Sequence, residues 1–289
     1  MIGVTEKLVS GAQQRRRLRV VQRGLMQGTH PTFVSPSLAK ICRSENCEIV
    51  MKAMKPTEEA SAVFSLGMTL LIVAIMWSVS SWGYYALVDA LALERGYDQA
   101  PMRFSGYYLM WSVVAAAAFW SVLSSRLTLS LVTGDLRMLL IALSIFGTYV
   151  AVILPLLPEV SVELAPLNPP EFMFASAWYY LPKSTDILFQ QVLISAMVFS
   201  AARTKIGLPA ISLGMAILFG GFHLLLALEG FTALYVIRFT IAASIFGLFV
   251  PYLYLRTRYG FRWAYGLHWS FYAVDATITH FMLGAPSWL

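Results

Sequence analysis

The feature that most constrains this chain is a series of long apolar runs, nearly free of charge, that begins near residue 61. Each run is about 20 residues or longer, the length that an α-helix needs to cross a hydrocarbon core of about 30 Å. Of the 289 residues, 58% are hydrophobic and 12% are charged. This composition excludes a disordered chain and an ordinary soluble enzyme. It predicts an all-α fold, a polytopic transmembrane helix bundle.

We count seven such runs, and each predicts one membrane-spanning helix because an open strand cannot satisfy its backbone in lipid. The first and fourth runs are long enough to tilt or to extend into the interface. In the fourth, Pro182 predicts that residues 172–181 lie at the interface and that the helix proper opens at the proline. The predicted limits are 61–93, 104–125, 138–158, 172–201, 207–228, 231–255 and 262–284.

The segments between the runs alternate between basic and non-basic. The N-terminal flank is basic, and the loops after the second, fourth and sixth runs also carry arginine or lysine. The 94–103 loop is mixed, the 159–171 loop has glutamates and no cation, and the C-terminal tail is uncharged. The positive-inside rule therefore predicts an integral membrane protein with a cytosolic N-terminus and its C-terminus on the opposite side. The bilayer also explains the net charge of +6, so we expect membrane lipids and no nucleic acid as partners.

Residues 1–60 differ from the rest of the chain. An arginine cluster leads into glycines and prolines rather than an apolar stretch, so we expect no signal peptide and a poorly ordered, basic cytosolic tail. Met51 and Met54 precede the first run, and we interpret the upstream segment as a dispensable extension or a mis-assigned start. Cys42 and Cys47 have no second ligand pair, so they are expected to be reduced thiols rather than a zinc site.

Ionisable side chains inside the predicted spans are functional candidates, because each costs several kcal/mol unless it is paired. Asp89 is expected to reach the interface. By the helical rise of about 1.5 Å per residue, His268 lies nearer the cytosolic end of its span, whereas the other five candidates share a level nearer the outer end. Tilt, or a bend at Gly220 and Gly221, would have to bring it to His223. The candidates in the last four spans are Asp186, His223, Arg238, His268, Asp275 and His280.

Two interpretations of these groups are open. A metal site would combine His223 and His268 from separate helices with a carboxylate from Asp186 or Asp275, since imidazole and carboxylate are ligands of zinc. Alternatively the histidines are buried and hydrogen-bonded to backbone or hydroxyl groups, and Arg238 neutralises Asp186 or Asp275.

The last four runs, about residues 172–284, resemble the CPBP family of intramembrane proteins (CAAX proteases and bacteriocin-processing enzymes, also called ABI). Phe219–His223 matches the family's Phe-x-x-x-His motif, and His268–Tyr272 lies where the family has His-x-x-x-Asn or Asp. Thr185–Gln190 occupies the place of the Glu-Glu-x-x-x-Arg motif. The resemblance implies a four-helix core at 172–284, preceded by a three-span region at 61–160.

The chain departs from the family at four motif positions. Thr185 stands for the catalytic glutamate, Asp186 for the second glutamate, Gln190 for the arginine and Tyr272 for the final Asn or Asp. In the family, the resemblance implies, that glutamate activates a zinc-bound water for attack on a peptide carbonyl. Threonine cannot accept the proton, and losing a general base typically costs about 10²–10⁴-fold. A shift in register would let Asp186 act as base, with Asp275 replacing the missing residue.

These departures favour a catalytically degenerate member of the family. It would bind another membrane protein or a lipidic segment, such as a lipidated peptide, in an intramembrane groove, without a metal. The glycines Gly214, Gly220 and Gly221 favour close helix approach to such a partner.

The alternative is an active zinc endopeptidase that cuts prenylated C-termini or leader peptides. Asp186 would be its base, and His223, His268 and Asp275 would hold the zinc. A haem between His223 and His280 is compatible in depth but lacks an attachment motif. A transporter is not favoured because the chain has no visible internal repeat.

Overall fold

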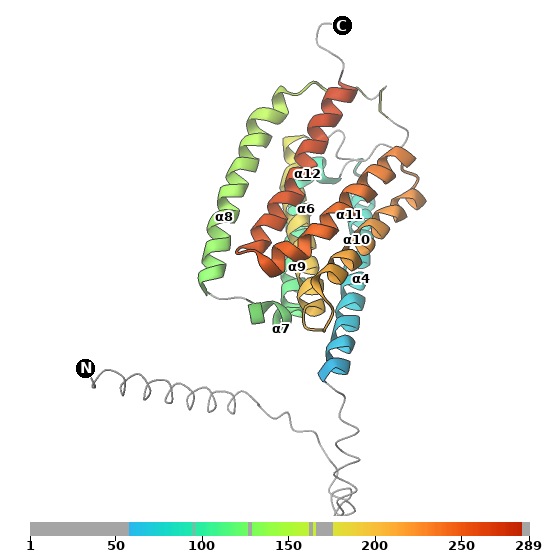
Figure 1. Cartoon of the computed structure of the whole chain (residues 1–289). Coiled ribbons are helices and arrows are strands. Elements are labelled where there is room, and N and C mark those ends of the chain that lie inside the picture. The colour runs from blue at the N-terminus through green and yellow to red at the C-terminus, as the bar shows by residue number, and fades with distance from the viewer. Residues whose placement is uncertain (1–57, 95, 127–128, 162–163, 166–175, 285–289) are drawn as a thin grey trace, which may run out of the picture. The chain divides into compact units, whose positions relative to one another are not determined.

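The computed structural model is entirely helical in its described part (Figure 1). That part contains no β-strand, only an isolated antiparallel bridge between Val160 and Gly284. The all-α fold class is therefore confirmed. Cys42, Cys47 and the predicted tail up to residue 57 lie outside the described residues. The structure describes residues 58–94, 96–126, 129–161, 164–165 and 176–284.

The helices form an N-terminal and a C-terminal group along the chain. The first group consists of α4 (Glu58–Ala90), the short α5 (Gly96–Gln99), α6 (Pro101–Ala118), α7 (Trp120–Leu123) and α8 (Leu129–Thr148), and α8 continues as a π-helical turn (Tyr149–Ile153) and a 3-10 turn (Leu154–Leu156). The second group consists of a 3-10 turn (Ala177–Tyr179), α9 (Tyr180–Ala201), α10 (Leu208–Leu224), a 3-10 turn (Leu225–Glu229), α11 (Ala233–Arg256) and α12 (Gly260–Leu283).

Five helical segments within the described ranges are long and apolar enough to cross a membrane, or up to six if the bent α6–α7 pair is one span. α12 has 24 residues but falls outside this set, because its charged, histidine and Trp/Tyr side chains lower its mean hydropathy. The chain thus has the helices of an integral membrane protein, whereas the count of seven spans is not confirmed. The five segments are Ser61–Ala90, Val132–Leu156, Ala177–Ala201, Leu208–Leu228 and Ala233–Arg256.

Three helix boundaries differ from the predicted ones. α8 begins at Leu129 rather than at residue 138, because no proline interrupts this charged but helix-compatible stretch. α9 begins at Tyr180, and Pro182 is tolerated in its first turn, where its missing N–H has no helical partner. The second predicted span bends by 67° between α6 and α7, and neither proline nor glycine marks the bend in the sequence.

α9 is the central helix of the described body (Figure 1). It packs against α4, α6, α11 and α12. Within the candidate span Ala177–Ala201, 61% of an apolar 18-residue stretch is buried inside the protein. Tyr179 and Tyr180 belong to the core, with 4% and 3% exposure. The predicted depth of this segment at the membrane interface stays a prediction, but these two rings face the protein and not the lipid. The physical reason is that Tyr179 packs on Tyr97 and Tyr180 packs on Trp269, so both rings are enclosed by aromatic neighbours.

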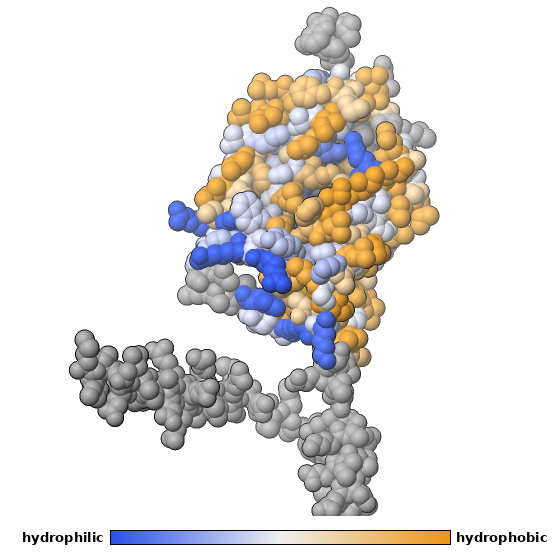
Figure 2. Space-filling view, in the orientation of Figure 1, coloured by the Kyte–Doolittle hydropathy of each residue, from blue (hydrophilic) through white to orange (hydrophobic). Residues whose placement is uncertain are grey.

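The basic connections gather at one end of this body. Arg203, just after α9, donates to the carbonyl of Ser121 and to the hydroxyl of Ser125, both at 2.9 Å. A Cβ at Gly134 of α8 would meet the ring of Tyr259, in the turn before α12. Figure 2 shows hydrophilic atoms concentrated at this end and apolar atoms over much of the rest of the visible face. The basic loops are therefore neighbours, as a membrane protein with one basic face requires.

α10 and α11 make the most extensive contact between any two described helices. A Cβ added at Gly247 would lie 2.7 Å from the Cα of Ala216, so the absence of a side chain permits this approach. Gly220 likewise faces a serine side chain of α11, whereas a Cβ at Gly214 or Gly221 would meet nothing within 4 Å. Of the three glycines singled out in the sequence, only Gly220 serves helix packing within the described chain.

Candidate functional site: an apolar pocket with two histidines

A pocket of about 480 Å³ lies between α10, α11 and α12. His223 of α10 and His268 of α12 both line it, so the two histidines of the predicted motifs reach one cavity. α10 and α11 run at an incline through the body (Figure 1), so position along α10 is a poor measure of depth. The lining residues are Phe219, His223, Phe239, Ala242, Ala243, Ile245, Phe246, Phe249, Leu267, His268, Ser270, Phe271, Tyr272 and Val274.

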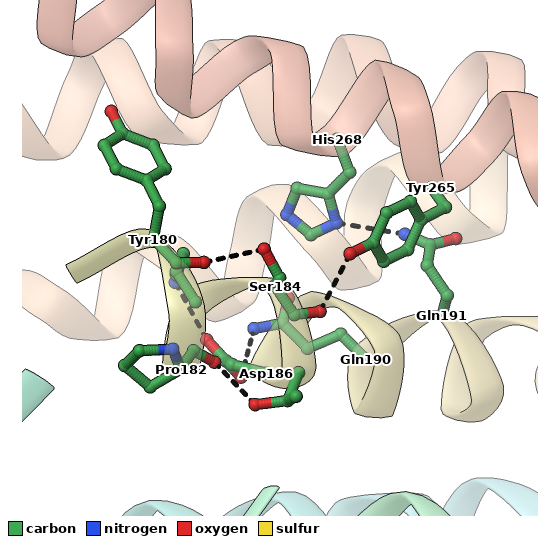
Figure 3. Close-up of polar contacts among 10 residues, drawn as sticks. Tyr180, Pro182, Ser184, Asp186, Gln190, Gln191, Tyr265 and His268 are labelled. Atoms are coloured by element: carbon green, nitrogen blue, oxygen red, sulfur yellow. Dashed lines mark hydrogen bonds and ion pairs between the residues drawn. The ribbon is translucent and has the colours of Figure 1, made fainter. Parts of the chain in front are cut away.

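His268 is fixed by polar contacts that link three helices. Its Nδ1 lies 3.0 Å from Nε2 of Gln191 in α9 (Figure 3). Gln191 is fully buried, and its Oε1 accepts a hydrogen bond of 2.7 Å from the hydroxyl of Tyr254 in α11. The imidazole also stacks on Tyr272, with ring centroids 5.7 Å apart, and meets Phe246 at 5.1 Å. This enclosure orients the ring.

His223 is fixed by its own helix. Its Nδ1 lies 2.8 Å from the carbonyl oxygen of Phe219, one turn earlier. Since a carbonyl only accepts, Nδ1 must donate and carry the ring proton. The ring lies near parallel to Phe239, with centroids 6.3 Å apart. Nε2 of His223 has no hydrogen-bond partner among the residues that the structure describes.

Asp186 forms a buried cluster at the start of α9. Its carboxylate accepts from Nζ of Lys183 at 2.8 Å and from Nε2 of Gln190 at 2.9 Å, and the Gln190 contact is drawn in Figure 3. The Lys183 ammonium also lies 4.1 Å from the ring centre of Tyr272, a cation–π contact. Thr185 donates to the carbonyl of Pro182 in its own helix at 2.9 Å. Both oxygens of Asp186 are therefore engaged, and neither Asp186 nor Thr185 lines the pocket.

The second carboxylate, Asp275, is neutralised from α11. One terminal nitrogen of Arg238 lies 3.0 Å and 3.1 Å from its two oxygens. Of the two partners considered for Arg238, the structure thus selects Asp275. His280 is held elsewhere: its Nδ1 donates to the carbonyl of Pro158 at 2.8 Å, and it does not line the pocket with His223. The depth match between those two histidines does not bring them together.

No group of three histidine, cysteine, aspartate or glutamate side chains that could hold a metal ion occurs among the described residues. His223 and His268 share the pocket, but Asp186 and Asp275 are each bound to a cation. The zinc hypothesis therefore remains a prediction that rests on the motif resemblance.

Sequence reasoning missed three polar residues of this region. Lys183 stands three positions before Asp186, the spacing of neighbours on a helix face. The helix was expected to open at Pro182, which placed Lys183 at its very end, where a lysine reaches water and needs no buried partner. Gln191 and Tyr254 carry no charge, so a search for ionisable groups passed over them. An amide within an apolar span was the available signal, because an unpaired amide in lipid is costly.

The fold and the pocket define a class: a helical integral membrane protein whose spans enclose an apolar cavity with a few fixed polar groups. Comparisons with protein-family models, curated proteins and solved structures find no match. The likeness to the CPBP family rests on the sequence motifs alone.

Proposed function

We propose that this protein is a catalytically degenerate, CPBP-like membrane protein that binds a lipidic chain in the pocket between α10, α11 and α12. One observation carries the proposal: the two motif histidines line an apolar pocket, while the nearby carboxylates are bound to Lys183 and Arg238. A general base must be free to accept a proton. Such a site is equipped to bind and not to hydrolyse.

The size of the pocket favours a lipid chain or lipidated peptide over a transmembrane helix of another protein. About 480 Å³ is within the range of small-molecule sites, roughly 300–1,000 Å³. A helix with its side chains is about 10–12 Å across and does not fit such a space. The apolar wall suits an acyl or prenyl chain, which loses nothing on leaving the bilayer.

Filling the pocket tests this proposal. A photoreactive acyl chain is expected to label wild-type protein on α10, α11 or α12, and unlabelled chain is expected to compete. Ala243→Trp places an indole in the cavity and is expected to lower labelling about tenfold or more. Ile217→Trp is the matched control, because Ile217 lies on α10, is 64% exposed and does not line the pocket. Equal labelling of both variants would contradict the proposed site.

An active zinc endopeptidase is the second candidate, favoured by the presence of both histidines on one pocket. It predicts about one zinc per purified chain, lost on His223→Ala, and peptide cleavage that is abolished by Asp186→Ala. The degenerate protein is expected to retain no stoichiometric zinc after purification with a weak chelator, by elemental analysis. Zinc-dependent cleavage of a prenylated peptide by the wild type would decide for the enzyme.

We further propose that the N-terminus is cytosolic and the C-terminus lies on the opposite side. The basic connections at one end of the body support this orientation. It requires α12 to cross the membrane, with Asp275 neutralised by Arg238 inside the span. A reporter active only outside the cytosol is expected to be active when fused after Leu289. A cytosolic reporter that is active there would contradict the topology.

A further inference from the structure

The two pocket histidines are held by different kinds of partner, and this fixes which ring nitrogen carries the proton in each. Nδ1 of His223 faces a backbone carbonyl, so it donates and Nε2 is left with a lone pair. Nδ1 of His268 faces the amide nitrogen of Gln191, so it accepts and Nε2 carries the hydrogen. The two neutral imidazoles are therefore opposite tautomers.

Tyr254 fixes the orientation of the Gln191 amide. Its hydroxyl lies 2.7 Å from Oε1 and 3.3 Å from the backbone carbonyl of Gln191. In this arrangement the hydroxyl donates to Oε1 of Gln191, and the hydrogens on Nε2 are directed to His268. Gln191 is 0% exposed, so no water competes for the amide. The relay from α11 through α9 to α12 sets the His268 tautomer.

The remaining nitrogen of each ring belongs to the pocket. No residue of α9 lines the cavity, so the Nδ1 side of His268 is turned away from it, and Figure 3 draws Nε2 on the side of the ring opposite Gln191. His223 uses Nδ1 within its own helix. No described protein atom hydrogen-bonds either Nε2. An apolar wall thus offers one acceptor, on His223, and one donor, on His268.

We infer that the pocket takes an apolar chain that ends in a hydroxyl group, a neutral group able both to donate to His223 and to accept from His268. This inference rests on the proposed function and names the class of its ligand. A carboxylate would bring an uncompensated charge and could not donate, and an ether could satisfy only His268. In a water-poor cavity an unpaired polar group is costly, so the ligand with both capacities is preferred. The same tautomers disfavour zinc, because Nε2 of His268 has no lone pair to give.

Nitrogen NMR of the full chain, labelled with ¹⁵N-histidine in lipid nanodiscs, tests the tautomers without any ligand. The unprotonated nitrogen is expected to be Nε2 in His223 and Nδ1 in His268, with the signals assigned by single histidine variants. Gln191→Leu is expected to remove the bias at His268. Gln190→Leu is the matched control, because Gln190 donates to Asp186 instead. An unprotonated Nε2 in wild-type His268 would overturn the inference.

Competition against the photoreactive acyl chain tests the ligand class, with dodecanol, its methyl ether, dodecanoate and dodecane as competitors. Dodecanol is expected to compete about tenfold better than the ether and dodecanoate, the net value of one neutral hydrogen bond. In His268→Phe, which keeps an aromatic ring, the alcohol keeps only its bond to His223, so its advantage over dodecane is expected to fall about tenfold. Equal competition by all four in the wild type would overturn the hydroxyl assignment and leave the lipid pocket standing. Failure of the acyl chain to label the pocket would instead remove the proposed function.

Discussion

Replacing Lys183 with methionine is expected to lower the free energy of unfolding by about 3–5 kcal/mol, the cost of leaving one member of a buried ion pair unpaired. The side chains of Lys183 and Asp186 are only 10% and 9% exposed, so water cannot replace the ammonium. The amide of Gln190 would remain as the partner of the carboxylate. We expect the midpoint of thermal unfolding in detergent to fall by on the order of 10 °C.

The double variant Lys183→Met with Asp186→Asn separates charge from packing. Asparagine has nearly the shape of aspartate but no charge, so the double variant is expected to recover most of the lost stability. Arg238→Met provides a second comparison. Its side chain is 35% exposed, but the proposed topology places this pair inside the span, so no water replaces the guanidinium and a loss of similar size is expected. A double variant as unstable as Lys183→Met would show that the ion pair is not the cause.

Replacing Gly247 with leucine is expected to separate α10 from α11 and to abolish labelling of the pocket. The first added carbon alone would lie 2.7 Å from the backbone of Ala216, closer than any normal contact. Backbone atoms cannot rotate away as a side-chain end can, so the helices must move apart. We expect a stability loss of about 3 kcal/mol, the upper end of the usual cost of overpacking.

Gly214→Leu is the matched control for this helix pair. It makes the same substitution on α10, where a Cβ would meet nothing within 4 Å. Because leucine favours the helix over glycine, this variant should be as stable as the wild type or slightly more stable, and it should label normally. Equal losses in Gly247→Leu and Gly214→Leu would locate the effect in helix propensity or lipid contact rather than in the close approach.

The fold class could be predicted from the sequence because long uncharged runs admit few structures in lipid. The motif resemblance placed His223 and His268 in one site, whereas depth along the helices had separated them. Boundaries were less predictable. The bend after Ala118 has no local residue that causes it, and the guanidinium of Arg203, which contacts the chain just beyond that bend, lies far away in sequence.

The partners of the polar groups were only partly predictable. Arg238 could pair with either Asp186 or Asp275, and the spacing of these residues in the sequence does not decide between the two. Lys183 resolves the choice, because it satisfies Asp186 from three residues away and leaves Asp275 for Arg238. The relay through Gln191 depends on the rotation of three helices about their axes. In an almost wholly apolar run every face of the helix is apolar, so the sequence pattern does not predict which face turns toward the protein.

α8 stands at the margin of the described body. Within the candidate span Val132–Leu156, only 6% of an apolar 18-residue stretch is buried inside the protein. It is joined to α12 by the stack of Phe146 on Trp269, with centroids 3.8 Å apart, and by the Tyr149 hydroxyl, which donates to the carbonyl of Ala273 at 2.8 Å. The same tyrosine also meets Thr277 and Tyr180, and Gly134 of α8 lies against Tyr259. Lipid solvates an apolar helix as well as protein does, so specific contacts of this kind hold α8 to the body. Moving α8 aside would therefore break ring stacks and hydrogen bonds at its margin without opening the core around α9, and it would let a molecule that diffuses in the bilayer approach α12 from this side.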